Sequence, residues 1–119
     1  MQTHKDLTVW KESRELVTFA YSIVAKFPKD ETFFLSAQIK RSVISIPSNI
    51  AEGAARDSNK EYIHFLYIAL GSAAELDTQI IIARDLKIIS DKNFKEISEK
   101  INRISKMLSG LIRFRQSKS

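Results

Sequence analysis

Few side chains in this chain have the type and spacing needed to bind a metal. Glu61 and His64 form a Glu-x-x-His pair, which di-iron helical bundles use twice, together with glutamates from other helices. Here the pair occurs once, and the other histidine, His4, lies close to the start of the sequence. We therefore interpret Glu61 as a helix-capping residue and His64 as a surface or interface residue, and we expect no metal site.

Few side chains in the sequence could support catalysis either. Glu52, Glu75 and Asp77 could form a carboxylate pair for acid–base catalysis. We favour the alternative, a polar network in which they satisfy Arg41 and Arg56 between helices. Two histidines give no serine a plausible triad, there is no cysteine nucleophile, and three glycines cannot build a phosphate loop or a dinucleotide fingerprint. We expect no enzyme activity and no cofactor.

The charge of the chain is concentrated near its C-terminal end. Residues 1–90 hold 11 Lys/Arg and 11 Asp/Glu, whereas residues 91–119 hold 8 and 3 and so carry the whole net charge of +5. An excess confined to one segment favours a polyanionic partner, although a solvated, lysine-rich helix is the alternative. The candidate phosphate-binding residues are Lys92, Lys95, Lys100, Arg103, Lys106, Arg113, Arg115 and Lys118.

The pattern of apolar residues predicts the elements that position these side chains. The chain has 119 residues, which fits one domain, and only three glycines and two prolines, which favours a few long helices. Apolar residues recur every three or four positions in four segments, about 8–26, 32–55, 60–86 and 91–114. We predict an all-α, antiparallel, up-down-up-down four-helix bundle. The longest unbroken apolar stretch, 65–70, is too short to span a bilayer, and the start lacks a secretory signal. We expect a cytoplasmic protein without a membrane partner.

The second segment contains three residues that are costly inside a helix. Pro47 removes a backbone hydrogen bond, Asn49 falls on the apolar stripe, and Gly53 lowers helix stability. Such choices within seven residues imply a specific local structure. We predict a kink near Pro47, stabilised by contacts of Asn49 and Glu52 with the third helix.

The third segment is apolar on nearly all sides. Between residues 62 and 83, 15 of 22 residues are apolar, and Ile68, Gly71 and Ile82 point away from the stripe that faces the core. A helix of this kind is buried on nearly all sides. We therefore predict an oligomer built on this helix, the alternative being a thick core that leaves some isoleucines exposed.

Two stretches of the sequence carry a resemblance to a known family. The more specific one is Ser45-Ile-Pro-Ser-Asn-Ile-Ala-Glu-Gly53, preceded by Gln38 and Lys40-Arg41-Ser42 and followed by Arg56. The other is residues 65–76 with Thr78-Gln79, in which Leu70 stands where Arg or Lys is frequent. Together with residues 7–11 and 27–31, they resemble the four-helix bundle proteins encoded in intervening sequences of bacterial 23S ribosomal RNA genes. The resemblance covers nearly the whole chain.

The resemblance implies an assembly and leaves two functions open. Family members form homopentameric barrels with a basic surface, and a related branch, the accessory variability protein of diversity-generating retroelements, works with a reverse transcriptase and binds nucleic acid. We expect an oligomeric scaffold that binds RNA or DNA through phosphate contacts. The alternative is a scaffold that docks a partner protein. The motif residues are assigned first to the architecture or the subunit interface: Gln38, Arg41, Pro47, Asn49, Glu52, Gly53, Arg56, Ile68, Gly71, Glu75 and Ile82.

Overall fold

Four long helices make up most of the structure. The computed structural model describes residues 2–31 and 34–118, and no β-strand occurs among them. Two short 3-10 helices, η1 (His4–Asp6) and η2 (Lys29–Glu31), precede α1 and α2 respectively. The long helices are α1 (Thr8–Val24), α2 (Leu35–Ala54), α3 (Asn59–Asp85) and α4 (Asp91–Gln116). The all-α prediction is confirmed. The expected start of the second helix at Thr32 lies outside the described residues.

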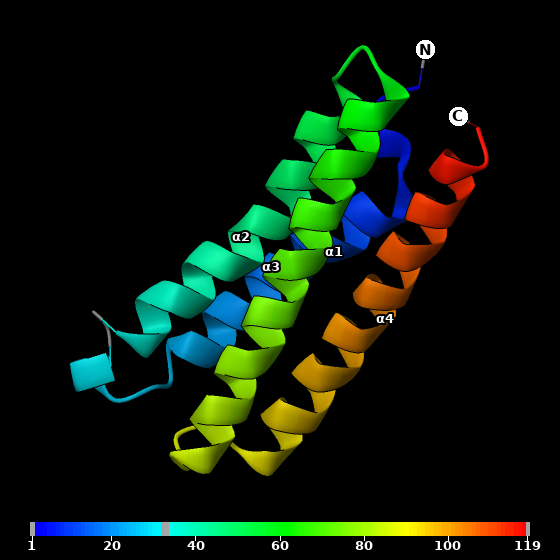
Figure 1. Ribbon diagram of the computed structural model, residues 1–119. Helices are drawn as coiled ribbons and strands as arrows, with labels where there is room; N and C mark the ends of the chain where they lie inside the picture. The colour runs from blue at the N-terminus through cyan, green and yellow to red at the C-terminus, as the bar shows by residue number, and fades with distance from the viewer. Residues whose placement is uncertain (1, 32–33, 119) are drawn as a thin grey trace.

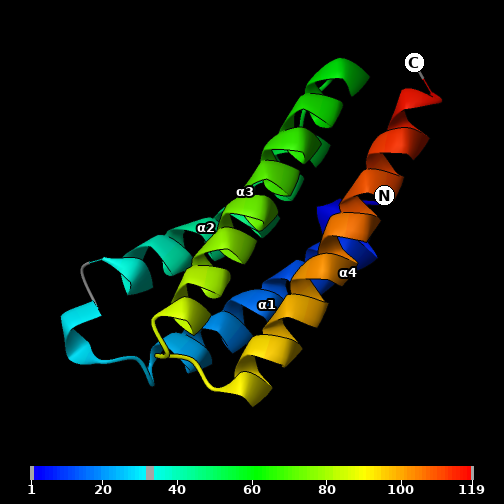
Figure 2. The ribbon, with the colours of Figure 1, turned by 60° about the horizontal axis from the view of Figure 1, so that its bottom comes forward.

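Each long helix runs antiparallel to the next, so both chain ends lie at the same end of an elongated bundle (Figure 1). The bundle measures 46 × 22 × 21 Å along its principal axes. Among neighbouring long helices, contacts are most extensive between α2 and α3 and least extensive between α1 and α4. The view turned by 60° shows α1 and α4 at one side of the bundle and α2 and α3 at the other (Figure 2).

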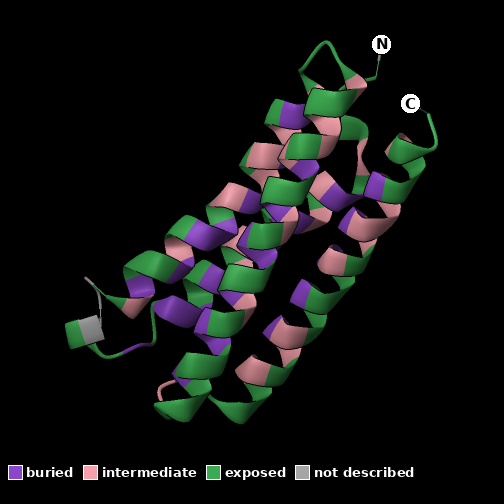
Figure 3. Cartoon of the chain, viewed as in Figure 1, coloured by how far each residue is buried: buried purple, intermediate pink, exposed green. Residues whose placement is uncertain are grey.

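The core follows the apolar stripes of the four helices. Leu16, Ile46, Leu76 and Leu108 are each at most 1% exposed, one from every long helix. Along the helices the buried positions alternate with exposed ones, and the buried side faces the bundle axis (Figure 3). Burial of this apolar surface provides the main stabilising free energy of the fold.

Helix ends follow local capping chemistry. Ser58 and Ser90 accept hydrogen bonds from the backbone N–H groups of Glu61 and Asn93, both at 3.1 Å, and so begin α3 and α4. Helix α3 ends at a turn in which Lys87 adopts a left-handed conformation (φ 61°). The N–H of Ile88 then donates to the carbonyl of Ala83 at 3.1 Å, which is a Schellman turn built without glycine.

Two of the costly residues in α2 have a visible structural reason. A Cβ added at Gly53 would lie 2.9 Å from Cβ of Phe65 and 3.1 Å from the carbonyl oxygen of Tyr62, so only glycine allows this approach of α2 to α3. The Asn49 side-chain amide donates to the carbonyl and hydroxyl oxygens of Ser45, one turn earlier, at 2.8 and 2.9 Å. Helix α2 continues through Pro47.

Candidate nucleic-acid interface

Helix α4 places most of its cations on the side that faces away from the core. Ile97, Ile101, Ile104, Leu108 and Ile112 are buried and set the orientation of the helix. At about 100° per residue, the opposite side carries Lys92, Lys95, Lys106 and Arg113, which we call the α4 basic face. All four are exposed, and within the described part of the chain none has a carboxylate within 4.0 Å. Their charges are therefore available to a partner.

Arg103, in contrast, is engaged within the subunit. Its Nε and Nη2 atoms donate to the two carboxylate oxygens of Glu12 on α1, at 2.6 and 2.9 Å. This hydrogen bonding lowers the pKa of the Glu12 carboxyl and raises the pKa of the Arg103 guanidinium. The pair joins α1 to α4, so Arg103 has a structural role that the charge count did not anticipate.

Arg115 is the second candidate that contacts its own subunit. It is partly buried, and its Nε donates to Oδ1 of Asn59 at 2.8 Å while its guanidinium lies 4.6 Å from the ring centroid of Tyr62. The Asn59 amide in turn donates to the Arg115 carbonyl at 2.7 Å. Burial raises the pKa of the Tyr62 hydroxyl. These contacts fix the end of α4 to the start of α3.

Lys100 and Lys118 lie away from the basic face and contact aromatic rings. The Lys100 ammonium is 5.3 Å from the ring centroid of Phe19, and that of Lys118 is 5.0 Å from the ring centroid of Phe114. Both lysines are exposed, so these contacts orient the charges without burying them.

A shallow hollow of about 360 Å³ lies on the basic face between Lys106 and Arg113. Ser105 and Ser109 also line it, so two cations and two hydroxyl groups border one space. Hydroxyl and cationic donors together are the groups that bind phosphate oxygens. The charge pattern of the sequence does not point to the two serines, although they stand at positions −1 and +3 relative to Lys106.

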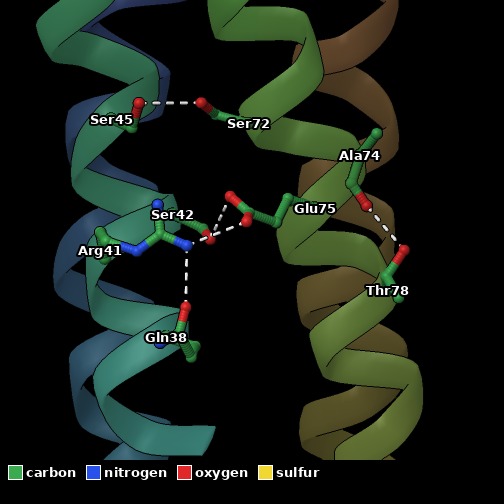
Figure 4. Close-up of polar contacts among 8 residues, drawn as sticks. All are labelled: Gln38, Arg41, Ser42, Ser45, Ser72, Ala74, Glu75 and Thr78. Carbon is green, nitrogen blue, oxygen red and sulfur yellow. Dashed lines mark hydrogen bonds and ion pairs between the residues drawn. The ribbon is translucent and has the colours of Figure 1, made fainter.

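The motif residues of α2 and α3 form a separate polar cluster between these helices (Figure 4). Arg41 donates to Glu75 at 2.9 Å and to Gln38 at 2.8 Å, and the Ser42 hydroxyl donates to the other Glu75 oxygen at 2.9 Å. Ser45 and Ser72 share a hydrogen bond of 2.8 Å one turn along. The Ser42 hydroxyl and the Arg41 guanidinium hold the pKa of the Glu75 carboxyl below its usual value.

Two predicted contacts with the third helix are wrong. Asn49 donates a hydrogen bond to Ser45 within α2. Glu52 forms an ion pair of 2.7 Å with Arg56, which lies just past the end of α2. Both side chains therefore bond to a residue four positions away in sequence, on the same side of the helix, and not to a residue of α3. Arg56 reaches α3 instead, with its guanidinium 4.8 Å from the ring centroid of Phe65.

The family can now be assigned from the whole chain. A family model described as 23S rRNA-intervening sequence protein matches residues 5–110. The chain belongs to the 23S rRNA-intervening sequence protein family. No curated protein matches it.

A solved structure supports the assignment of this 23S rRNA-intervening sequence protein. It is the crystal structure, at 1.70 Å resolution, of a protein with unknown function from the S23 ribosomal protein family of Bacteroides thetaiotaomicron. The two chains are 26% identical and superpose with a TM-score of 0.83, over 88% of this chain and 98% of the other. The four-helix fold is therefore shared along nearly the full length of both.

The outer side of α3 in this family member is largely exposed. Tyr67, Ile68, Ile81 and Ile82 are 51%, 38%, 36% and 42% exposed, and a Cβ added at Gly71 would meet nothing within 4 Å. By length and composition α3 could cross a membrane, since an 18-residue window has a mean hydropathy of 1.3. However, 39% of that window is buried in the bundle, and core helices of soluble proteins pass the same test.

The carboxylates considered for catalysis do not gather into one site. Glu75 is held by Arg41 and Ser42, and Glu52 is held by Arg56. Within residues 2–31 and 34–118, no group of three or more His, Asp or Glu side chains is arranged to hold a metal ion. Two surfaces of this 23S rRNA-intervening sequence protein are therefore candidates for binding a partner: the α4 basic face and the apolar outer side of α3.

Proposed function

We propose that this protein is a non-catalytic, oligomeric scaffold that binds RNA or DNA mainly through phosphate contacts. The observation that carries the proposal is the α4 basic face. Its four cations, which have no acidic partner among the described residues, line one side of the helix over about 30 Å. Cations in this arrangement neutralise phosphates and release counterions without reading the base sequence.

The outer side of α3 supports the oligomeric part of the proposal. Its exposed aromatic and aliphatic side chains form an apolar surface of the kind that marks protein–protein contacts. We propose that other copies of the chain cover it, with five copies as the number that the family resemblance implies. Repetition of the basic face around such an assembly would give a nucleic acid many weak contacts at once.

The binding test uses paired charge-removing variants. Fluorescence anisotropy of a structured RNA and of a matched DNA duplex should show affinity falling steeply between about 50 and 200 mM salt. Changing Lys106→Gln and Arg113→Gln together should reduce the salt slope by about 2 per engaged subunit, so that the loss of affinity over this range becomes about tenfold smaller. The matched control, Lys26→Gln with Lys29→Gln, removes the same charge near the other end of the bundle and should leave the slope unchanged.

Two results would contradict the proposed interface. If the Lys106 and Arg113 variant keeps the original slope, the α4 basic face does not contact phosphates. If the control variant loses as much slope, binding reflects net charge alone.

Assembly is tested separately by the mass in solution. Ile82→Asp should lower it, whereas Ile44→Asp, at a similarly exposed isoleucine of α2 (44% against 42%), should not.

The second candidate function is a scaffold that docks a partner protein. The same apolar side of α3 favours it, since such a surface accepts a foreign helix as readily as another copy of this chain. A monomeric mass, together with no nucleic-acid binding at low salt, would favour this function over the first.

A further inference from the structure

A groove beside α1, bounded in part by α2, lies outside both surfaces described so far. Trp10, Arg14 and Thr18 line two adjoining hollows of about 810 and 400 Å³. The larger also borders Lys5 and Lys11, and the smaller extends along α2 to Ile44, Pro47 and Ser48. We call these two hollows the α1–α2 groove. Both hollows are open to solvent.

The indole of Trp10 lines both hollows of the groove. Its ring is partly exposed, with the imidazole of His4 against it at a centroid distance of 5.1 Å and an interplanar angle of 71°. The guanidinium of Arg14 lies 5.6 Å from the ring centroid. An aromatic ring with a planar cation beside it is a surface on which flat, electron-rich groups stack.

Pro47 is the costly residue that packing inside the subunit does not explain. Gly53 is required by the close approach of α3, and Asn49 satisfies its amide within α2. Pro47, by contrast, presents a partly exposed ring to the groove across from Trp10. A proline there gives the groove a rigid apolar wall with no backbone N–H to be satisfied.

The charges around the groove favour an anionic occupant. Lys5, Lys11 and Arg14 are all exposed at its border, and Glu15 is the one acid among the residues that line it. An occupant that is anionic and also has a flat face that stacks is a nucleotide. An acidic peptide would match the charge, but it would leave the Trp10 and Arg14 surface without a flat partner.

We propose that the α1–α2 groove takes unpaired nucleotides of a bound nucleic acid, with a base stacked on Trp10 and Arg14 and phosphates beside Lys5 and Lys11. This inference rests on the proposed function, since it names which part of the nucleic acid the subunit holds away from α4. Helix α1, which lines the groove, contacts α4, and the Glu12–Arg103 pair joins these two helices. One strand can therefore follow α4 and enter the groove across α1.

The chain contains a single tryptophan and three tyrosines, so fluorescence excited at a wavelength that only tryptophan absorbs appreciably reports on this groove. The full-length protein is titrated with a single-stranded oligonucleotide of about 12 nucleotides, with an abasic strand of equal length, and with the corresponding duplex. We expect all three to bind at low salt by anisotropy, and only the base-bearing single strand to quench Trp10. It should also bind about 5- to 150-fold more tightly than the abasic strand, which is the range of base stacking on an aromatic residue.

Variants separate stacking from a structural role of the indole. Trp10→Leu should bring the affinities for the base-bearing and abasic strands close together while both still bind. Arg14→Gln, at an exposed position, should weaken the quenching of the retained Trp10. Lys29→Gln, which removes one positive charge outside the groove, should change neither result.

Three outcomes would overturn the inference. If the base-bearing and abasic strands bind equally and the Trp10 fluorescence does not change, the groove inference fails and the proposed function stands. If no nucleic acid binds even at low salt, both fail together. If polyglutamate quenches Trp10 as strongly as the base-bearing strand, the groove selects negative charge and not a nucleotide.

Discussion

Gly53→Ala offers the sharpest test of how α2 and α3 pack. The new Cβ would lie 2.9 Å from Cβ of Phe65 and 3.1 Å from the carbonyl oxygen of Tyr62. Neither atom can rotate away, because one is a backbone oxygen and the other is attached directly to the backbone. Helix α3 must therefore move as a unit, away from the helix with which it makes its most extensive contacts.

The expected loss of stability follows from three contributions. Alanine gains about 1 kcal/mol over glycine inside a helix. Overpacking costs about 1–3 kcal/mol. The Ser42–Glu75 and Ser45–Ser72 hydrogen bonds span the same two helices, and stretching them costs about 1 kcal/mol each. We expect a net destabilisation of about 2–4 kcal/mol, which lowers the Tm by about 8–16 °C for a chain of this size.

The assay is chemical and thermal unfolding followed by circular dichroism. Gly110→Ala is the matched control, because its nearest added contact is Nη2 of Arg113 at an ordinary 3.9 Å. That variant should gain about 0.5–1 kcal/mol from helix propensity alone. If Gly53→Ala is as stable as the original protein, or rises with the control, the close approach of α2 and α3 does not limit the packing and the reasoning is wrong.

The remaining predictions address charge and backbone strain. The pKa of Glu75 is lowered on folding, so its ion pair stabilises the protein above the usual pKa of 4.5 and is lost as the pH falls through the lowered value. In the Glu75→Gln variant, the free energy of unfolding should therefore change less between about pH 7 and 3 than in the original protein. The difference should be less than about 1 kcal/mol because the group is exposed, and an identical pH profile of the two proteins would contradict this. Glu12→Gln frees Arg103 and should increase nucleic-acid affinity in the anisotropy assay; lower affinity would show that positioning of Arg103 matters more than its free charge. Lys87→Gly relieves a left-handed backbone and should raise the free energy of unfolding by about 1 kcal/mol. A lower free energy of unfolding, measured with denaturant, would refute this.

The architecture could be predicted because helix packing depends on a periodic pattern. Apolar residues every three or four positions fix which side of each helix is buried, and α1, α3 and α4 begin within one residue of the predicted starts. The sequence also indicated that Gly53 and Asn49 needed a special environment. It could not identify the close approach of Gly53 to Phe65, because that contact depends on the rotation of α2 within the bundle. For Asn49, the apolar stripe pointed to α3, whereas the side chain bonds to Ser45 within α2.

The candidate site was only partly predictable for a related reason. A charge count locates cations along the chain, but it does not show which of them find a partner after folding. Arg103 meets Glu12, 91 residues away in sequence, and Arg115 turns toward Asn59 and Tyr62. The α1–α2 groove is lined by residues of η1, α1 and α2, some of which lie more than 30 positions apart, and no local sequence pattern connects them.

The limited contact between α1 and α4 has a consequence for the order in which the bundle forms and opens. Helices α2 and α3 are neighbours in sequence and share the most contacts, so they can pair early at a small cost in loop-closure entropy. Docking of α1 against α4 closes a far longer loop for fewer contacts, and it ends with the Glu12–Arg103 pair. In native-state hydrogen exchange we expect the amides of α1 to exchange as a cooperative unit before those of α2 and α3. The groove that α1 forms with α2 would open in the same event.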